Sequence, residues 1–183
     1  AMTAAIAIRP FVAADAATFR RLRLAALAAH PGAFGNSVAD EEAVPMATVA
    51  ERLARGDTFG AFDGVGPGAM AGFFQESGEK RRHRGLLWGV YVDPARRGLG
   101  LAGRLVDRVV QHAAGRVEML HLGVAVDNRE ARRVYEGRGF VAFGIEHRAF
   151  KLGDRYVDEL LMVRFLSGPP APIDALRAIL QVP

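Results

Sequence analysis

The chain has 183 residues, of which 50% are hydrophobic and 24% are charged, a composition typical of one compact globular domain and not of a disordered or fibrous chain. It contains no cysteine, which excludes a thiol nucleophile, an acyl-cysteine intermediate and any cysteine-ligated metal. The net charge is +4, but the basic residues are dispersed along the chain, which argues against nucleic-acid binding. No apolar run approaches the roughly 20 residues of a membrane span, so a cytoplasmic location is expected.

The first third of the chain predicts one strand and two helices. Alternating apolar residues predict a strand over 5–11, and apolar residues three and four apart predict a helix that Asp15 caps and that ends at His30. A polar connection at 36–42 then leads to a second short helix over 49–53.

The rest of the chain predicts a sheet of several strands. In chain order we expect strands at 58–62, 69–75 and 86–92, a helix at 100–114, a strand at 119–126, a helix at 128–137, and strands at 140–150 and 156–165. The strand at 86–92 is apolar nearly throughout, which is typical of a central strand buried on both faces. Because strands and helices do not alternate regularly, the predicted fold class is α+β, with a mixed, mostly antiparallel central sheet flanked by helices.

A glycine-rich turn, Asp93–Gly103, joins the central strand to the following helix. Its small residues let a ligand approach the backbone, and amides at a helix start can bind a phosphate or pyrophosphate. Gly98, Gly100 and Gly103 satisfy the dinucleotide pattern G-x-G-x-x-G, which would indicate a nicotinamide oxidoreductase. Two features argue against that interpretation: five residues separate the strand from the first glycine, and the acid Glu118 precedes the next strand instead of following it.

The same turn contains Arg97-x-x-Gly100-x-Ala102, which fits the coenzyme A pyrophosphate pattern Q/R-x-x-G-x-G/A. With the segment VYVDP (90–94) before it and NREARRVYEGRGF (128–140) after it, the chain resembles the GNAT superfamily of acyl-coenzyme A dependent N-acetyltransferases, from about residue 6 to residue 165. The resemblance implies the GNAT acyltransferase fold, with acetyl-coenzyme A (acetyl-CoA) as co-substrate and no metal.

In this family the cofactor arm lies where the central strand separates from its neighbour. The resemblance implies that the backbone of Val90, Tyr91 and Val92 hydrogen-bonds the arm and points an amide at the thioester carbonyl. It implies a pyrophosphate site made by the turn and the helix start: Arg97, Gly98, Leu99, Gly100, Leu101, Ala102 and Gly103. Asn128 is implied to contact the arm while it caps the next helix.

The resemblance also assigns an acid but leaves the base open. Tyr135 lies seven residues after Asn128, on the same helix face, and is implied to protonate the departing thiolate. Several family members place a glutamate where this chain has Gly123. His121, on the same strand face, is a candidate to relay a proton through water, and bulk water is another. Further candidates lie on the final strands: Glu146, His147, Asp158 and Glu159.

The sequence thus predicts an N-acetyltransferase in which a primary amine attacks acetyl-CoA directly in a ternary complex. The amine could belong to a small molecule, a peptide N-terminus or a lysine, and the connection at 30–42 is expected to form the acceptor wall. The alternatives are a regulatory domain that binds acyl-CoA without catalysis and, less favoured, the oxidoreductase. Residues 1–166 form the predicted domain, and 167–183 a proline-rich linker and short helix whose apolar stripe would be buried against the domain or in a homodimer.

Overall fold

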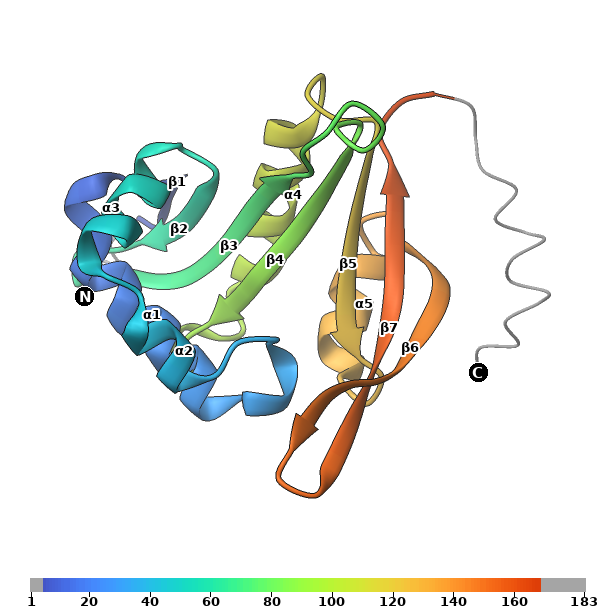
Figure 1. The fold of residues 1–183 in the computed structure, drawn as a ribbon. Coiled ribbons are helices and arrows are strands. Elements are labelled where there is room, and N and C mark those ends of the chain that lie inside the picture. The colour runs from blue at the N-terminus through green and yellow to red at the C-terminus, as the bar shows by residue number, and fades with distance from the viewer. Residues whose placement is uncertain (1–4, 169–183) are drawn as a thin grey trace.

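The computed structural model describes residues 5–168 and contains a seven-stranded sheet with the order β1-β2-β3-β4-β5-β7-β6 (Figure 1). Its strands are β1 (Ala7–Pro10), β2 (Thr58–Phe62), β3 (Pro67–Gln75), β4 (Arg84–Val92), β5 (Met119–Ala125), β6 (Val141–Leu152) and β7 (Arg155–Phe165). Its helices are α1 (Ala16–Ala29), α2 (Val38–Ala43), α3 (Met46–Ala54), α4 (Leu101–Ala113) and α5 (Arg129–Glu136), with short 3-10 turns η1 (Ala13–Asp15), η2 (Pro31–Ala33) and η3 (Pro94–Arg96). The predicted helix at 173–180 lies outside the described residues.

The predicted fold class is confirmed. Every neighbouring pair of strands is antiparallel except β4 and β5. The antiparallel pairs before and after that parallel pair also overturn the dinucleotide interpretation, because a doubly wound fold repeats parallel strands joined by helices. Within residues 5–168, no helix is both long and apolar enough to cross a membrane.

One helix was not predicted. The polar stretch at 36–42 holds α2, which begins with a reciprocal capping arrangement. The Ser37 hydroxyl accepts a hydrogen bond from the Asp40 amide at 3.1 Å, and the Asp40 carboxylate accepts one from the Ser37 amide at 2.8 Å. The signal was present as a serine followed three residues later by an acid, with Asp in place of the usual Glu or Gln.

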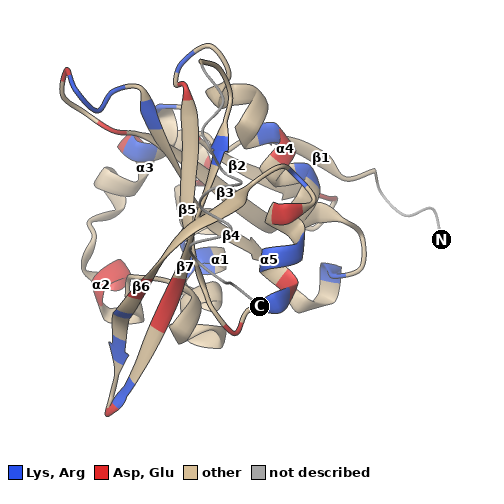
Figure 2. Cartoon of the chain, turned by 90° about the vertical axis from the view of Figure 1, so that its right-hand side faces the viewer, with Lys and Arg blue, Asp and Glu red and all other residues tan. Residues whose placement is uncertain are grey.

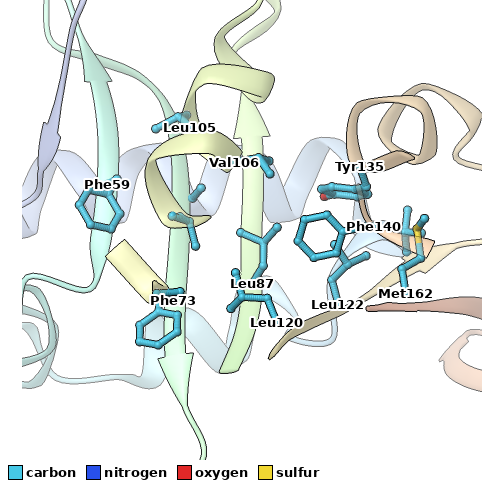
Figure 3. Close-up of a cluster of buried hydrophobic side chains, with 14 of the residues drawn as sticks. Phe59, Phe73, Leu87, Leu105, Val106, Leu120, Leu122, Tyr135, Phe140 and Met162 are labelled. Atoms are coloured by element: carbon cyan, nitrogen blue, oxygen red, sulfur yellow. The ribbon is translucent and has the colours of Figure 1, made fainter. Parts of the chain in front are cut away.

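The two faces of the sheet carry separate hydrophobic clusters. On one face, α4 and α5 pack on β3, β4, β5 and β7 through the residues shown in Figure 3, which include Leu87, Leu105, Val106, Leu120, Tyr135 and Met162. On the other face, α1 and α3 pack on β3 and β4 through residues that include Phe19, Leu22, Leu53, Met70 and Tyr91. We call these the α4 face and the α1 face.

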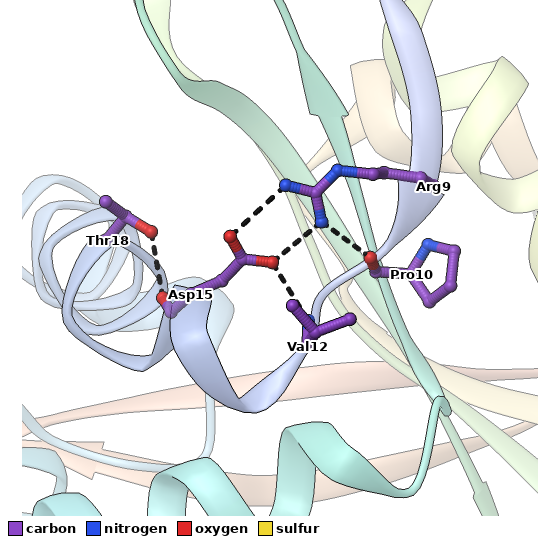
Figure 4. Close-up of polar contacts among 5 residues, drawn as sticks. All are labelled: Arg9, Pro10, Val12, Asp15 and Thr18. Carbon is purple, nitrogen blue, oxygen red and sulfur yellow. Dashed lines mark hydrogen bonds and ion pairs between the residues drawn. The ribbon is translucent and has the colours of Figure 1, made fainter.

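Asp15 occupies the residue before α1, as predicted, but its carboxylate does not cap the helix. It accepts hydrogen bonds from the Arg9 guanidinium at 2.7 Å and from the Val12 amide at 2.9 Å (Figure 4). The Arg9 guanidinium, more than any other group, holds the pKa of Asp15 below its usual value. Asp15 therefore ties β1 to the turn that enters α1.

The central pair of strands separates soon after it begins. β4 and β5 pair only from Arg84–Leu86 to Met119–His121, although β4 continues to Val92 and β5 to Ala125. Figure 1 shows β4 and β5 diverging from this short contact. Beyond it, the edge of β4 that faces β5 has no strand partner among residues 5–168, so its backbone groups can bind another extended chain.

A bulge in β4 lies within the diverging part. Met70 of β3 faces Tyr91, but Gly72 faces Trp88, so β4 has one extra residue against β3. Gly89 in the bulge has φ +66°, a left-handed conformation that glycine adopts without a steric penalty.

Candidate active site

A cleft of about 700 Å³ opens where β4 and β5 diverge, a volume typical of small-molecule sites. Its walls come from the end of β4, the turn into α4, the first turn of α4, the whole length of α5, the start of β7 and the connection after α1. The lining residues include Val90–Val92, Arg97, Gly98, Gly100–Gly103, Asn128 and Tyr135. The segments named by sequence motifs, which lie far apart along the chain, therefore meet around one cavity.

Six of the candidate site residues do not line this cleft: Leu99, His121, Glu146, His147, Asp158 and Glu159. Leu99 is 52% exposed, so its side chain does not contribute to the wall. His121 lies opposite Leu86, at the last position where β5 is still paired with β4, before the two strands separate. His30, from the expected acceptor wall, lines the cleft, and the structure adds lining residues to which the sequence assigned no role: Glu130, Arg138, Arg155 and Val157.

The glycine-rich turn presents bare backbone to the cleft. Gly98 and Gly100 have φ values of +79° and +67°, and a Cβ added to either would have no heavy atom within 4 Å. The amides of Gly100–Gly103 begin α4, where the first four N–H groups have no partner within a helix. Amides and a helix dipole in this arrangement can bind an anion, and the space above the glycines is open enough for one.

Two side-chain contacts hold the glycine-rich turn in place, one from Arg96 and one from Arg97. Arg96 Nε lies 2.7 Å from Asp63 Oδ2 in the β2–β3 turn, and this hydrogen bond lowers the pKa of Asp63 strongly. Arg97 Nη2 lies 3.1 Å from His30 Nε2 in the connection after α1. The turn is thus held between the sheet and the predicted acceptor wall, with Arg97 at the cleft.

Asn128 and Tyr135 lie at the two ends of α5 and both line the cleft. Asn128 Oδ1 accepts a hydrogen bond from the Ala131 amide at 3.2 Å, which caps the helix and leaves the side-chain amide nitrogen free to donate. Tyr135 is 8% exposed and packs edge-on against Phe140 at 6.1 Å between ring centres (Figure 3). Burial raises the pKa of Tyr135 well above its usual value, so the residue stays a protonated donor.

His121 belongs to a polar cluster away from the cleft. Its Nε2 lies 3.0 Å from Glu76 Oε1, and its Nδ1 lies 3.4 Å from Arg84 Nη2. Burial, followed by the positive charge of Arg84, lowers the pKa of His121 although Glu76 opposes the shift. His121 was a candidate because it lies on the same face of its strand as Gly123. In the structure, however, its contacts are with Glu76 and Arg84, and neither of these residues lines the cleft.

A sheet that opens between two parallel strands beside a glycine-rich helix start defines an acyl-CoA type of binding site. The model of the Acetyltransferase (GNAT) family matches residues 14–140. The chain belongs to this family, as the sequence resemblance indicated.

Comparison with individual proteins agrees with this assignment. The chain is 36% identical over 142 residues to a mycothiol acetyltransferase of Kineococcus radiotolerans, an alignment that covers 76% of this chain and 44% of that protein. The chain thus spans less than half of that relative.

Solved structures share the fold at lower identity. The putative acetyltransferase yncA from Salmonella typhimurium, solved with acetyl-CoA, superposes with a TM-score of 0.75 at 22% identity over 92% of this chain and 98% of that one. A putative acetyltransferase from Acinetobacter baylyi gives 0.78 at 18% identity over 93% and 98%.

Proposed function

We propose that the chain is an N-acetyltransferase that moves the acetyl group of acetyl-CoA to a primary amine. The observation that carries this proposal is the parallel strand pair that stops after three residues and opens directly onto the amides at the start of α4. Such an arrangement offers a free strand edge for an extended amide-containing arm and a helix N-terminus for its phosphates. The acetyl-CoA bound to yncA and the activity named for the Kineococcus relative support the same assignment.

Different groups of cleft residues would bind different parts of acetyl-CoA. Gly98–Gly103 would hold the pyrophosphate through their amides, with the Arg97 guanidinium as a further donor. The unpaired edge of β4 at Val90–Val92 would hydrogen-bond the pantetheine arm, and one of its amides would stabilise negative charge on the carbonyl oxygen. Asn128 would donate to the arm from the opposite wall.

When bound, acetyl-CoA would supply an acetyl thioester. The acceptor nitrogen forms a bond to the carbonyl carbon, and the C–S bond breaks and leaves its electron pair on sulfur. Tyr135 provides the proton that the sulfur takes, because it is a buried phenol on the cleft wall and stays protonated. The acceptor nitrogen loses its proton to a base. The chain has no cysteine to carry the acetyl group, which favours direct attack by the amine in a ternary complex.

The acceptor would enter from the α1 face, where η2 and the residues around it cover the opening. His30, Gly32 and Phe34 of this connection line the cleft together with Arg155 and Val157 of β7. A small molecule, a peptide N-terminus and a lysine side chain are all amines that such a wall could admit.

Two measurements in sequence test the proposal. Acetyl-CoA should raise the melting temperature of the chain and NAD should not, because only a ligand of the native state stabilises it. Release of free thiol should then depend on an added amine, in a panel that spans small amines, peptides and lysine.

The competing assignment is a domain that binds acyl-CoA without catalysis, favoured by the glycine at position 123. Stabilisation by acetyl-CoA with no thiol release for any amine would support it over acetyl transfer.

Self-association is also proposed. The stripe expected in the tail, beyond the described residues, would be covered by a second subunit. Light scattering should report a dimer for the full chain and a monomer for a chain that ends at Ser167, and equal masses would contradict a role for the tail.

A further inference from the structure

The carboxylate of Glu159 occupies the space that Gly123 leaves open beside the cleft. Gly123 lies on β5 and Glu159 on the neighbouring strand β7. A Cβ added to Gly123 would lie 2.4 Å from Glu159 Oε2 and 2.8 Å from its carboxyl carbon. Gly123 itself is exposed, so the carboxylate lies over an accessible stretch of β5. The chain therefore has an acid where a side chain at position 123 would begin, delivered from the adjacent strand.

The direction of this side chain follows from the alternation of β7. Leu160 packs in the cluster on the α4 face together with Tyr135, so Glu159 points to the opposite, α1 face. Ala125, the cross-strand partner of Glu159, lines the cleft, and so does Val157, two residues along β7. Glu159 is not itself a lining residue, but it lies next to these two lining residues on the α1 face, from which the acceptor would enter, whereas Tyr135 packs on the α4 face.

Within the described part of the chain, no oppositely charged side chain pairs with Glu159. It is half-buried, yet none of the ion pairs formed among residues 5–168 includes it. An unpaired carboxylate that is partly removed from water costs stability, and such groups concentrate at functional sites. Figure 2 shows the acidic segment of β7 that contains Glu159 in red.

The charged groups around Glu159 also suit a proton acceptor. Its partner across β6 is Glu146, and burial followed by this negative charge raises the pKa of Glu159. β5 faces it with Gly123 and, farther along, His121, which is held by Glu76. From the connection after α1, the titratable residue that lines the cleft is His30, whose ring nitrogen contacts Arg97 instead.

We propose that Glu159 is the general base that removes the proton from the acceptor ammonium, an inference that rests on the proposed acetyl transfer. The ammonium N–H gives its proton to the Glu159 carboxylate, and the freed lone pair forms the N–C bond as the C–S bond breaks. The sulfur takes a proton from Tyr135, which is reprotonated from solvent, and Glu159 later releases its proton to solvent. Acid and base would act from opposite faces of the sheet through the opening between β4 and β5.

The first test compares two amines, one with a pKa of about 10 and one with a pKa near 7. At about pH 8, Glu159→Gln should lower kcat/KM for the more basic amine by about 10²–10⁴-fold. It should affect the less basic amine much less, because that amine is already largely neutral at this pH. The Kd for acetyl-CoA should not change. Asp154→Asn, an exposed acid in the β6–β7 turn, is the matched control and should leave both rates unchanged.

The second test moves the carboxylate to the other strand. In an enzyme with Glu159→Ala, adding Gly123→Glu should recover a large part of the lost rate, because the space above position 123 is then free. Adding Gly123→Ala fills the same space without an acid and should recover nothing. Glu146→Gln in the otherwise unchanged chain should shift the acidic break of the kcat/KM profile to lower pH, because it removes the negative charge that raises the pKa of Glu159.

The outcomes separate this inference from the proposed function. If the chain acetylates an amine and Glu159→Gln affects both amines equally or neither, Glu159 is not the base and the acetyl transfer stands. If the unmodified chain binds acetyl-CoA and acetylates no amine of the panel, the proposed transfer is overturned and the role of Glu159 with it.

Discussion

The guanidinium of Arg138 lies in the place where a side chain at Gly103 would stand. Arg138 Nε donates to the Gly103 carbonyl at 2.8 Å, Nη1 donates to the Val134 carbonyl at 3.2 Å, and the group pairs with Asp107 at 3.1 Å. A Cβ at position 103 would lie 1.8 Å from Arg138 Nη2. This contact joins the first turn of α4 to the segment that follows α5, so the absence of a side chain at Gly103 serves the packing between these two segments.

Gly103→Ala should therefore have two opposing effects on the free energy of unfolding. Alanine favours a helix over glycine by about 1 kcal/mol, but it displaces Arg138 from hydrogen bonds that contribute about 0.5–1.5 kcal/mol each. We expect Gly103→Ala to be neutral or destabilising in the native chain and stabilising by about 1 kcal/mol in a chain with Arg138→Ala. Denaturant unfolding of the four proteins measures this coupling. The same change in both backgrounds would show that the two residues are independent.

Gly100→Val should abolish binding of acetyl-CoA. The left-handed conformation at position 100 disfavours a β-branched residue, by about 1–2 kcal/mol, and the side chain would occupy the open space above the turn. Gly115→Val is a matched control at the other end of α4, because Gly115 also has a positive φ (+80°) and no atom within 4 Å of an added Cβ. Both variants should lose similar stability, but calorimetry should detect a binding defect only for Gly100→Val. Equal affinity for the two would remove Gly100 from the site.

Tyr135→Phe should lower kcat by roughly 100-fold or more while the affinity for acetyl-CoA stays near that of the native chain. The ring packing against Phe140 is kept, and only the proton donor is lost. Tyr156→Phe, on the exposed part of β7, should leave kcat unchanged. A parallel loss of rate and of melting temperature in Tyr135→Phe would instead assign the hydroxyl a structural role.

Asp15→Asn should make stability less dependent on pH. Because the folded-state pKa of Asp15 is lowered, chiefly by Arg9, its ionised form stabilises the fold above its unfolded pKa of about 3.9, and this contribution is lost as the pH falls through the lower folded value. We expect a loss of about 1 kcal/mol or less at pH 7, since the Arg9 side chain is 43% exposed. The difference should vanish near about pH 2. Glu51→Gln on the exposed side of α3 is the control. A constant difference at all pH values would contradict this origin.

Local patterns were sufficient to predict most of the fold. Apolar alternation, continuous apolar runs and helical spacing located every strand and all α-helices of residues 5–168 except α2, because the buried positions of each element are specified by its own residues. The motif at Arg97–Gly103 marked the cleft for the same reason, since a glycine turn and a helix start form a binding surface without help from distant residues.

The parts of the site that depend on strand register could not be ranked from the sequence. His121 and Glu159 were both candidates, and neither lines the cleft. Only the pairing of β5 with β7 shows that Glu159 lies opposite a lining residue, Ala125, whereas His121 lies opposite Val163. The contacts Arg96–Asp63 and Arg138–Gly103 likewise join residues more than 30 positions apart. Spacing along one element carries no information on such pairs.

The three-residue contact between β4 and β5 divides the backbone hydrogen bonding of the sheet into two groups of strands, β1–β4 and β5–β7–β6. An extended arm bound along β4 would supply hydrogen bonds that the sheet lacks there. It would thereby restrict the motion of the two groups of strands relative to each other. Amide hydrogen exchange in the diverging halves of β4 and β5 should therefore slow together when acetyl-CoA binds, whereas amides of the β1–β2 pair should exchange as before.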